Sequence, residues 1–267
     1  MKTKFWNLSI YRIIATIAVL MFHIFYLLVA KDIPYPMLLS KGVQGLTAMS
    51  GFLYSQKLIE NKKDFYLKNI KKLLIPALSV VVCIAIGNLA VMIINNSWDN
   101  NYFSMFVGNR PFDGRFITQL DNYYYIIYII GCYIVTPFIQ KDNKTSKIII
   151  VSLCVLEIIL AFFFRQALIV TAYMVGYIIG KKYFNKYTDY SKFDWRSIVQ
   201  WIVVIGVAVG LYILAINLRT IENQTWLVKE SISLLNNISS ASIGVGSFFL
   251  ISGALIFVNK FIKKSYF

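Results

Sequence analysis

The chain alternates between long apolar runs and short polar segments along its whole length. An α-helix of about 20 apolar residues crosses a hydrocarbon core of roughly 30 Å, and several of the runs reach that length. The pattern predicts eight spanning helices, of which the second is the weakest because it is rich in Gly and Ser. They are residues 8–30, 40–58, 73–95, 120–140, 147–165, 167–184, 198–217 and 241–260. We therefore expect an all-α polytopic transmembrane helix bundle, with residues 1–267 forming a single integral-membrane domain.

The positive charges orient this predicted bundle. With the N-terminus placed inside, the inside segments hold 19 lysines and arginines and the outside segments hold 7, while Arg12 falls within the membrane. Cytoplasmic segments of membrane proteins carry such an excess of positive charge. The five tryptophans agree, because all of them lie at or near predicted helix ends, where an interfacial belt is expected. The count therefore predicts eight spans with both the N- and the C-terminus in the cytoplasm.

Composition supports a membrane protein and argues against other classes. Of the residues 58% are hydrophobic, and the mean hydropathy is +0.64. The net charge of +15 stands in short clusters between apolar runs, so the expected partner is a lipid bilayer and no nucleic acid. Cys83, Cys132 and Cys154 fall inside apolar runs without metal-ligand spacing, which predicts small core residues and no metal site.

Two ionisable residues stand inside the first apolar run, and His23 is the only histidine of the chain. Arg12 and His23 are eleven residues apart, which is about 20° more than three full helical turns, so both lie on one helix face. Burying ionisable groups in a bilayer is costly, and such residues mark functional sites by default. A snorkelling arginine and a hydrogen-bonded core histidine are the alternative explanation. If the two residues form a functional site, a neutral His23 serves as general base.

Two further segments carry candidate binding residues. Residues 42–58 read GVQGLTAMSGFLYSQKL, and small residues such as Ser50 allow close approach of either a neighbouring backbone or a substrate. Residues 65–78 read FYLKNIKKLLIPAL, with Lys68, Lys71 and Lys72 ahead of a proline. The positive-inside rule alone accounts for these lysines, and they are equally suited to hold the phosphates of a cofactor at the membrane edge.

One acidic residue and one long loop complete the candidates. Glu157 is the one acidic residue deep within a predicted span. It is either a protonated or locally paired carboxyl, or an intramembrane partner of Arg12 or of a substrate group. The predicted outside loop 96–119 mixes aromatic residues with Arg110 and Arg115. This loop is either a solvated connection or an acceptor-binding surface, since carbohydrate sites favour aromatic platforms beside charged groups.

These segments, in this order, resemble the membrane-bound acyltransferase-3 family. YRIIATIAVLMFH resembles its first-helix motif of an arginine and a histidine, and GVQGLTAMSGFLYSQKL its small-residue segment that ends in SGFL. FYLKNIKKLLIPAL resembles the basic stretch before a proline that opens the third helix of the family. LDNYYYIIYIIGCYIVTPFI and YMVGYIIGKKYF are similar to two later helices, so that the resemblance covers residues 11 to about 184.

The chain also departs from the family pattern. Gln44 stands where many members have aspartate, and Lys68 and Lys71 stand where members usually have arginines. Lysines replace bidentate phosphate contacts by point charges. Family members typically have ten helices, against the eight predicted here. The terminal NKFIKKSYF resembles the approach to a further helix, so the resemblance implies a shortened member that lacks the last two helices.

The resemblance implies an enzyme of the cell (plasma) membrane, a multi-pass O-acyltransferase of the cell envelope. Such an enzyme moves an acyl group, often acetyl from acetyl-CoA, onto a hydroxyl of a cell-surface or exported polysaccharide. His23 would deprotonate the acceptor hydroxyl, and Arg12 and the lysines from Lys68 to Lys72 would hold cofactor phosphates or developing negative charge. The implied partners are the bilayer, acyl-CoA and a glycan acceptor.

Two other functions stay open at this point. A transporter or flippase for a lipid-linked saccharide would use Arg12 and Glu157 to line its pathway. A non-catalytic family member or assembly subunit would explain the missing C-terminal helices. A transporter or flippase would move its saccharide without acyl-CoA, whereas an acyltransferase requires it. A non-catalytic member would fail to bind labelled acetyl-CoA.

Overall fold

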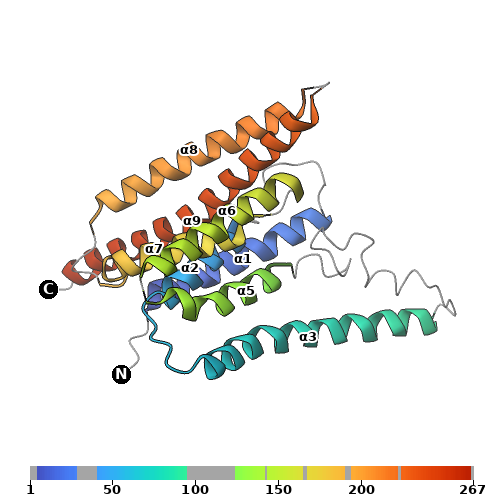
Figure 1. The fold of residues 1–267 in the computed structure, drawn as a ribbon, viewed down its shortest axis with the longest axis horizontal. Helices are drawn as coiled ribbons and strands as arrows, with labels where there is room; N and C mark the ends of the chain where they lie inside the picture. Colours follow the sequence, from blue (N-terminus) through green and yellow to red (C-terminus); the bar gives the residue numbers. More distant parts are fainter. Residues whose placement is uncertain are drawn as a thin grey trace. The chain divides into compact units, whose positions relative to one another are not determined.

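The computed structural model describes residues 5–28, 41–94, 124–141, 143–164, 167–189, 194–221 and 224–265. These residues form eight α-helices and one short 3-10 helix, and no strand occurs among them (Figure 1). The helices are α1 (Trp6–Leu28), α2 (Gly42–Tyr54), α3 (Lys62–Ile94), α5 (Tyr124–Ile139), α6 (Lys144–Phe164), α7 (Ile169–Tyr183), η3 (Phe184–Tyr187), α8 (Arg196–Arg219) and α9 (Trp226–Ser265). The all-α prediction is confirmed.

Each predicted span coincides with one of these helices, but two helices begin well before their apolar runs. α3 starts at Lys62 and α9 at Trp226, because helical backbone continues into polar residues that hydropathy alone leaves out. In the described part of the chain, α6, α8 and Trp226–Asn259 of α9 are long and apolar enough to cross a membrane. Trp6–Phe22 and Ile126–Ile139 are shorter apolar helices. Eight spans with cytoplasmic termini remain a prediction.

The chain separates into two compact units. The first comprises Met1–Lys57 and Ile148–Phe267, and the second comprises Leu58–Lys147. In the first unit α2 packs along α7 and α9, α1 packs on α2 and α9, and α8 runs alongside α9 (Figure 1). α2 and α7 have 13 and 15 residues, which at 1.5 Å per residue makes them about 20 Å and 22 Å long. They are short helices buried among longer ones.

The contact between α2 and α7 depends on glycine. A Cβ atom at Gly51 would overlap the carbonyl oxygen of Tyr173, and one at Gly176 would overlap that of Ala48. Two helices approach backbone to backbone only where such small residues meet. The interpretation of residues 42–58 as a packing seam is therefore confirmed.

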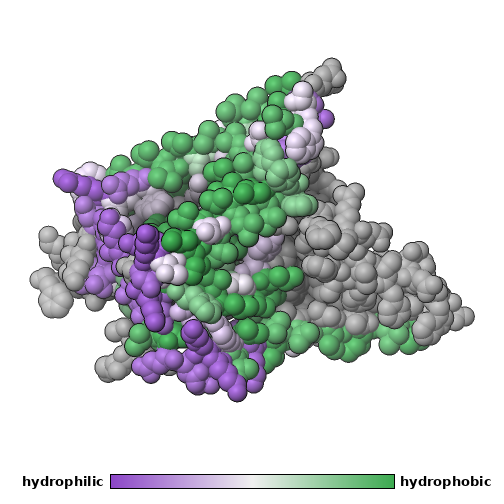
Figure 2. Space-filling model, in the orientation of Figure 1, coloured by the Kyte–Doolittle hydropathy of each residue, from purple (hydrophilic) through white to green (hydrophobic). Residues whose placement is uncertain are grey.

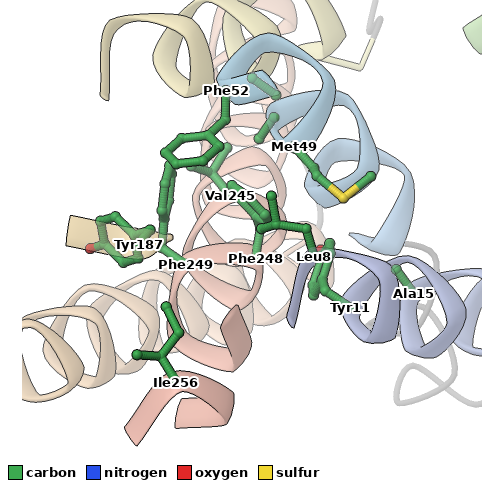
Figure 3. Packing of buried hydrophobic residues seen from close by; sticks show 12 residues of the cluster. Leu8, Tyr11, Ala15, Met49, Phe52, Tyr187, Val245, Phe248, Phe249 and Ile256 are labelled. Carbon is green, nitrogen blue, oxygen red and sulfur yellow. The ribbon is translucent and has the colours of Figure 1, made fainter. Parts of the chain in front are cut away.

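An aromatic cluster fills the space between α2, η3 and α9. The ring of Phe52 stacks on Phe184 at 5.0 Å between centroids, and meets Phe248 and Phe249 edge-on at 5.6 Å and 5.7 Å. Phe248 also contacts Tyr11 of α1 at 5.0 Å (Figure 3). Aromatic pairs in these geometries add about 0.5–1.5 kcal/mol each beyond the area that they bury. This cluster holds α1, α2 and α9 in fixed register.

The outer faces of α6 and α8 are apolar and exposed. Val203 and Val207 of α8 are each 59% exposed, and Val151 of α6 is 60% exposed. Figure 2 shows this hydrophobic surface along both helices. An apolar face of this kind is what a helix presents to lipid.

The second unit consists of α3 and α5. The backbone of Ile59, ahead of α3, exchanges two hydrogen bonds with the side chain of Gln140, at 3.1 Å and 3.2 Å. Tyr66 donates to the carbonyl oxygen of Ile134 at 3.0 Å, and the Lys62 ammonium lies 4.3 Å from the ring centre of Phe138. Polar contacts thus join the first turns of α3 to α5.

Candidate functional site

α1 carries the two ionisable residues that the sequence singles out. It is continuous from Trp6 to Leu28, so Arg12 and His23 occupy one face of a single helix, about 16 Å apart along its axis. Arg12 is exposed. The backbone of His23 lies within α1, whereas its side chain is outside the described part.

The face of α1 that packs into the bundle is a different one. Leu8, Tyr11 and Ala15 are at most 3% exposed and belong to the core cluster shared with α2 and α9 (Figure 3). Arg12 is rotated by 100° from Tyr11 around the helix axis. The position of Arg12 is therefore not occupied by the packing that holds α1 in place.

Two buried polar atoms lie on α1 and α2, one on each helix, and the sequence did not indicate either of them. The Tyr11 hydroxyl lies near Ser247 without a hydrogen bond of normal geometry, and a Cβ atom at Gly45 would overlap it. The side-chain oxygen of Gln44, 5% exposed as a residue, also has no hydrogen-bond partner among the described residues. The one available signal was the departure of Gln44 from the aspartate of the resembling family.

Glu157 lies at the junction of α6 and α7. Its side chain is 4% exposed, and its two carboxylate oxygens accept hydrogen bonds from the backbone N–H groups of Val170 at 2.7 Å and Thr171 at 2.6 Å. α7 begins at Ile169, so the carboxylate satisfies donors of the first turn that have no partner within the helix. Its negative charge also faces the positive end of the helix dipole. Glu157 is thus a locally paired carboxyl that caps α7.

The remaining candidate residues fall in different parts of the chain. Ser50 of α2 is half-buried, and its hydroxyl donates to the carbonyl oxygen of Leu46 at 3.0 Å. Lys68, Lys71 and Lys72 are exposed on α3 of the second unit. The first unit therefore holds Arg12, His23, Ser50 and Glu157, and the second holds the three lysines. Arg110 and Arg115 lie outside the described residues.

Lys41, which immediately precedes α2, is a further residue without a sequence signal. Its ammonium group lies 5.2 Å from the ring centre of Tyr212. Burial, and to a smaller extent the positive charge of Arg219, together lower the pKa of Lys41 to about 8. The charge count places both Lys41 and Arg219 in outside segments, and the structure brings them near each other within the first unit.

Metal-binding chemistry finds no support in the described residues. No three side chains of His, Cys, Asp or Glu come together there in a group that could hold a metal ion. Cys132 is buried and Cys154 is half-buried, as expected for small core residues.

These features define a helical membrane protein whose first helix carries an exposed arginine, Arg12. A family model described as Acyltransferase domain, that of the acyltransferase-3 family, matches residues 5–264. The chain belongs to this family, and the resemblance seen in its motifs is confirmed. Neither the curated proteins nor the solved structures that were searched give a match. Family membership supports a membrane acyltransferase that uses an acyl donor.

Proposed function

We propose that this chain is an O-acyltransferase of the plasma membrane that moves an acetyl or other acyl group from acyl-CoA to a hydroxyl of a cell-surface or exported polysaccharide. The observation that carries the proposal is the family match over residues 5–264, which includes all of α1. The position of Arg12 on a face that packing leaves unoccupied supports it further.

The chemistry assigns His23 to the acceptor. A neutral imidazole takes the proton of the acceptor hydroxyl while that oxygen attacks the thioester carbonyl. The new C–O bond forms an ester, the C–S bond breaks, and the departing CoA thiolate takes up the proton from the imidazolium. Arg12, about 16 Å from His23 along the helix axis, would hold phosphates of the acyl donor rather than contact the reacting carbonyl. The reaction balances without a metal ion or an oxidant.

The other candidate residues would bind the acyl donor and the acceptor. Lys68, Lys71 and Lys72 are exposed point charges suited to phosphates of the acyl donor. Ser50, Arg110 and Arg115 would contact the acceptor. Glu157 has a structural role in this scheme, because its carboxylate accepts hydrogen bonds from backbone N–H groups of α7.

The predicted topology gives the transfer a direction. The lysines lie in a segment that the charge count assigns to the cytoplasm, where acyl-CoA is made. His23 lies toward the outer half of the first span, some 16 Å from Arg12 along the helix axis. The acyl group would then pass from a donor inside to an acceptor outside.

His23→Ala tests this function in an assay that supplies labelled acetyl-CoA and the polysaccharide to purified protein. Loss of a general base lowers turnover by about 10²–10⁴-fold. Ile17→Ala, at an exposed position of the same helix and about 140° around its axis from Arg12, is the matched control and should acylate normally. Normal acylation by the His23 variant contradicts the proposal. Movement of a lipid-linked saccharide without any need for acyl-CoA would instead establish a flippase.

A further inference from the structure

Two adjoining hollows lie in the first unit between the end of α7, η3 and the start of α8. Their volumes are about 370 Å³ and 310 Å³, and both are lined by Tyr183 and Lys186. We call the pair the interfacial groove. It involves none of the residues assigned to acyl transfer above.

The inner wall of the groove is fixed by an aromatic pair. The indole N–H of Trp201 donates to the hydroxyl oxygen of Tyr187 at 2.6 Å. The Trp201 ring also stacks on Phe249 of α9, at 4.9 Å and 14° between planes. Because these contacts fix the side chains of Trp201 and Tyr187, this wall of the groove is preformed. Trp and Tyr rings prefer the depth at which a membrane meets water.

One end of the groove is basic. Lys186 lines both hollows, and Lys181 and Lys182 line the smaller one. Asp194 also lines the smaller hollow, but its carboxylate accepts the backbone N–H of Arg196 at 3.1 Å and so faces the start of α8. The N-terminus of the 24-residue α8 adds the positive end of its dipole.

Ser197, in the first turn of α8, supplies an unused hydrogen-bonding group at this end. It lines the larger hollow and is 2% exposed, and its hydroxyl has no hydrogen-bond partner among the described residues. A buried hydroxyl without a hydrogen-bond partner destabilises the fold. An anion in the groove would give this hydroxyl an acceptor.

The other end of the groove is apolar and reaches the lipid-facing surface. Ile179 and Val204 line it, and Val204 is 41% exposed on the same helix as the outward-facing Val203 and Val207. Figure 2 shows hydrophilic residues gathered where α8 begins and hydrophobic ones farther along that helix. The groove thus runs from positive charge near the start of α8 to apolar surface that continues along α8.

We propose that the interfacial groove binds an anionic phospholipid of the cytoplasmic leaflet. Its phosphate group contacts Lys186 and Ser197, and one acyl chain lies along Ile179 and Val204. Basic residues near a membrane surface favour anionic over neutral lipids. A side that opens onto the lipid-facing surface suits an occupant that arrives from the bilayer. This proposal stands whether or not the chain transfers acyl groups.

Quenching of Trp201 by brominated lipids tests the proposal. The whole chain is placed in nanodiscs that contain either dibrominated phosphatidylglycerol or dibrominated phosphatidylcholine at equal mole fraction. The signal is the fluorescence of the native chain minus that of a Trp201→Phe variant. We expect stronger quenching by phosphatidylglycerol, and Lys186→Gln should lower this preference about fivefold, as removal of one basic group near an anionic surface predicts.

Lys144→Gln, at an exposed lysine that starts α6, is the matched control and should keep the preference. Ser197→Ala, which removes one hydrogen bond only, should weaken it to a smaller extent. Equal quenching by the two lipids overturns the proposal, as does an equal effect of the Lys186 and Lys144 variants. Displacement of the brominated phosphatidylglycerol by free coenzyme A would overturn it as well, because the groove would then be a donor site.

Discussion

The start of α1 and the junction of α6 with α7 both place an ionisable side chain within apolar helices, yet they treat it in opposite ways. Arg12 is exposed, and the packed face of α1 is the one that carries Leu8, Tyr11 and Ala15. Glu157 is buried, and two backbone N–H groups engage its carboxylate. An intramembrane charge is therefore a candidate for chemistry chiefly where the fold does not already use it.

Of the two regions compared, α1 should show the larger effect on activity when its charge is removed. Arg12→Gln is expected to lower kcat/KM for acyl transfer about 10- to 100-fold, mainly through a higher KM for the acyl donor, because a charged contact to the donor phosphates is lost. The free energy of unfolding should change by less than about 0.5 kcal/mol, as for other exposed positions. The two measurements are acylation with labelled acetyl-CoA and the unfolding temperature in detergent.

Arg12→Lys provides the comparison for that loss. It keeps the charge without the planar fork of the guanidinium, and should recover part of the activity. Full activity of Arg12→Gln would show that Arg12 takes no part in acyl transfer and is only a snorkelling side chain.

The reverse result is expected at the junction of α6 and α7. Glu157→Gln replaces one acceptor oxygen by an N–H donor, so one N–H of α7 loses its partner. This change should lower the stability by about 2 kcal/mol, while turnover per folded molecule stays near that of the native chain. Thermal unfolding and an assay normalised to folded protein separate the two quantities. Ser152→Ala, exposed on the same helix, should leave both unchanged.

Lost turnover with unchanged stability in Glu157→Gln would reverse the comparison. Glu157 would then belong with Arg12 as a group that touches substrate, as a partner of the kind that its position in the sequence also allowed.

The two regions show which features of the fold and of the candidate site could be predicted from the sequence. The apolar runs were sufficient to predict all eight helices, and the spacing of Arg12 and His23 was sufficient to predict their common face, because both depend only on the local sequence and on helix geometry. The role of Glu157 as a helix cap was not readable, since its partners Val170 and Thr171 depend on how α7 folds back on α6. The interfacial groove could not be predicted either, because it is formed by segments that meet only in the folded chain.

Tyr11, next to Arg12 in sequence, sharpens the contrast on a smaller scale. Its hydroxyl is buried without a hydrogen bond of normal geometry, so Tyr11→Phe should leave stability unchanged or raise it by up to about 1 kcal/mol. Activity should be kept, because this face serves packing. A large loss of acylation in a stable Tyr11→Phe variant would show that both faces of α1 take part in chemistry.

Lys41 extends the comparison to the predicted outer edge of the membrane, where the expected effect is smallest. Its pKa is about 8 in the folded chain against 10.5 for an ordinary lysine. Between these values the unfolded chain holds more protons than the folded one, so stability rises with pH across this window. The native chain should therefore gain in unfolding temperature between pH 7 and pH 10 relative to Lys41→Met.

The sign of this effect distinguishes a half-buried lysine from an exposed one. Below about pH 8 the folded chain bears the full cost of the charged ammonium, so Lys41→Met should be the more stable protein at pH 7. The advantage should close as the pH rises toward 10.5, where both states of the native chain lose the proton. Lys229→Met, at an exposed position, should instead follow the native chain in parallel. Parallel curves for Lys41→Met would mean that water reaches the Lys41 ammonium, which would then belong with Arg12 among the exposed charges.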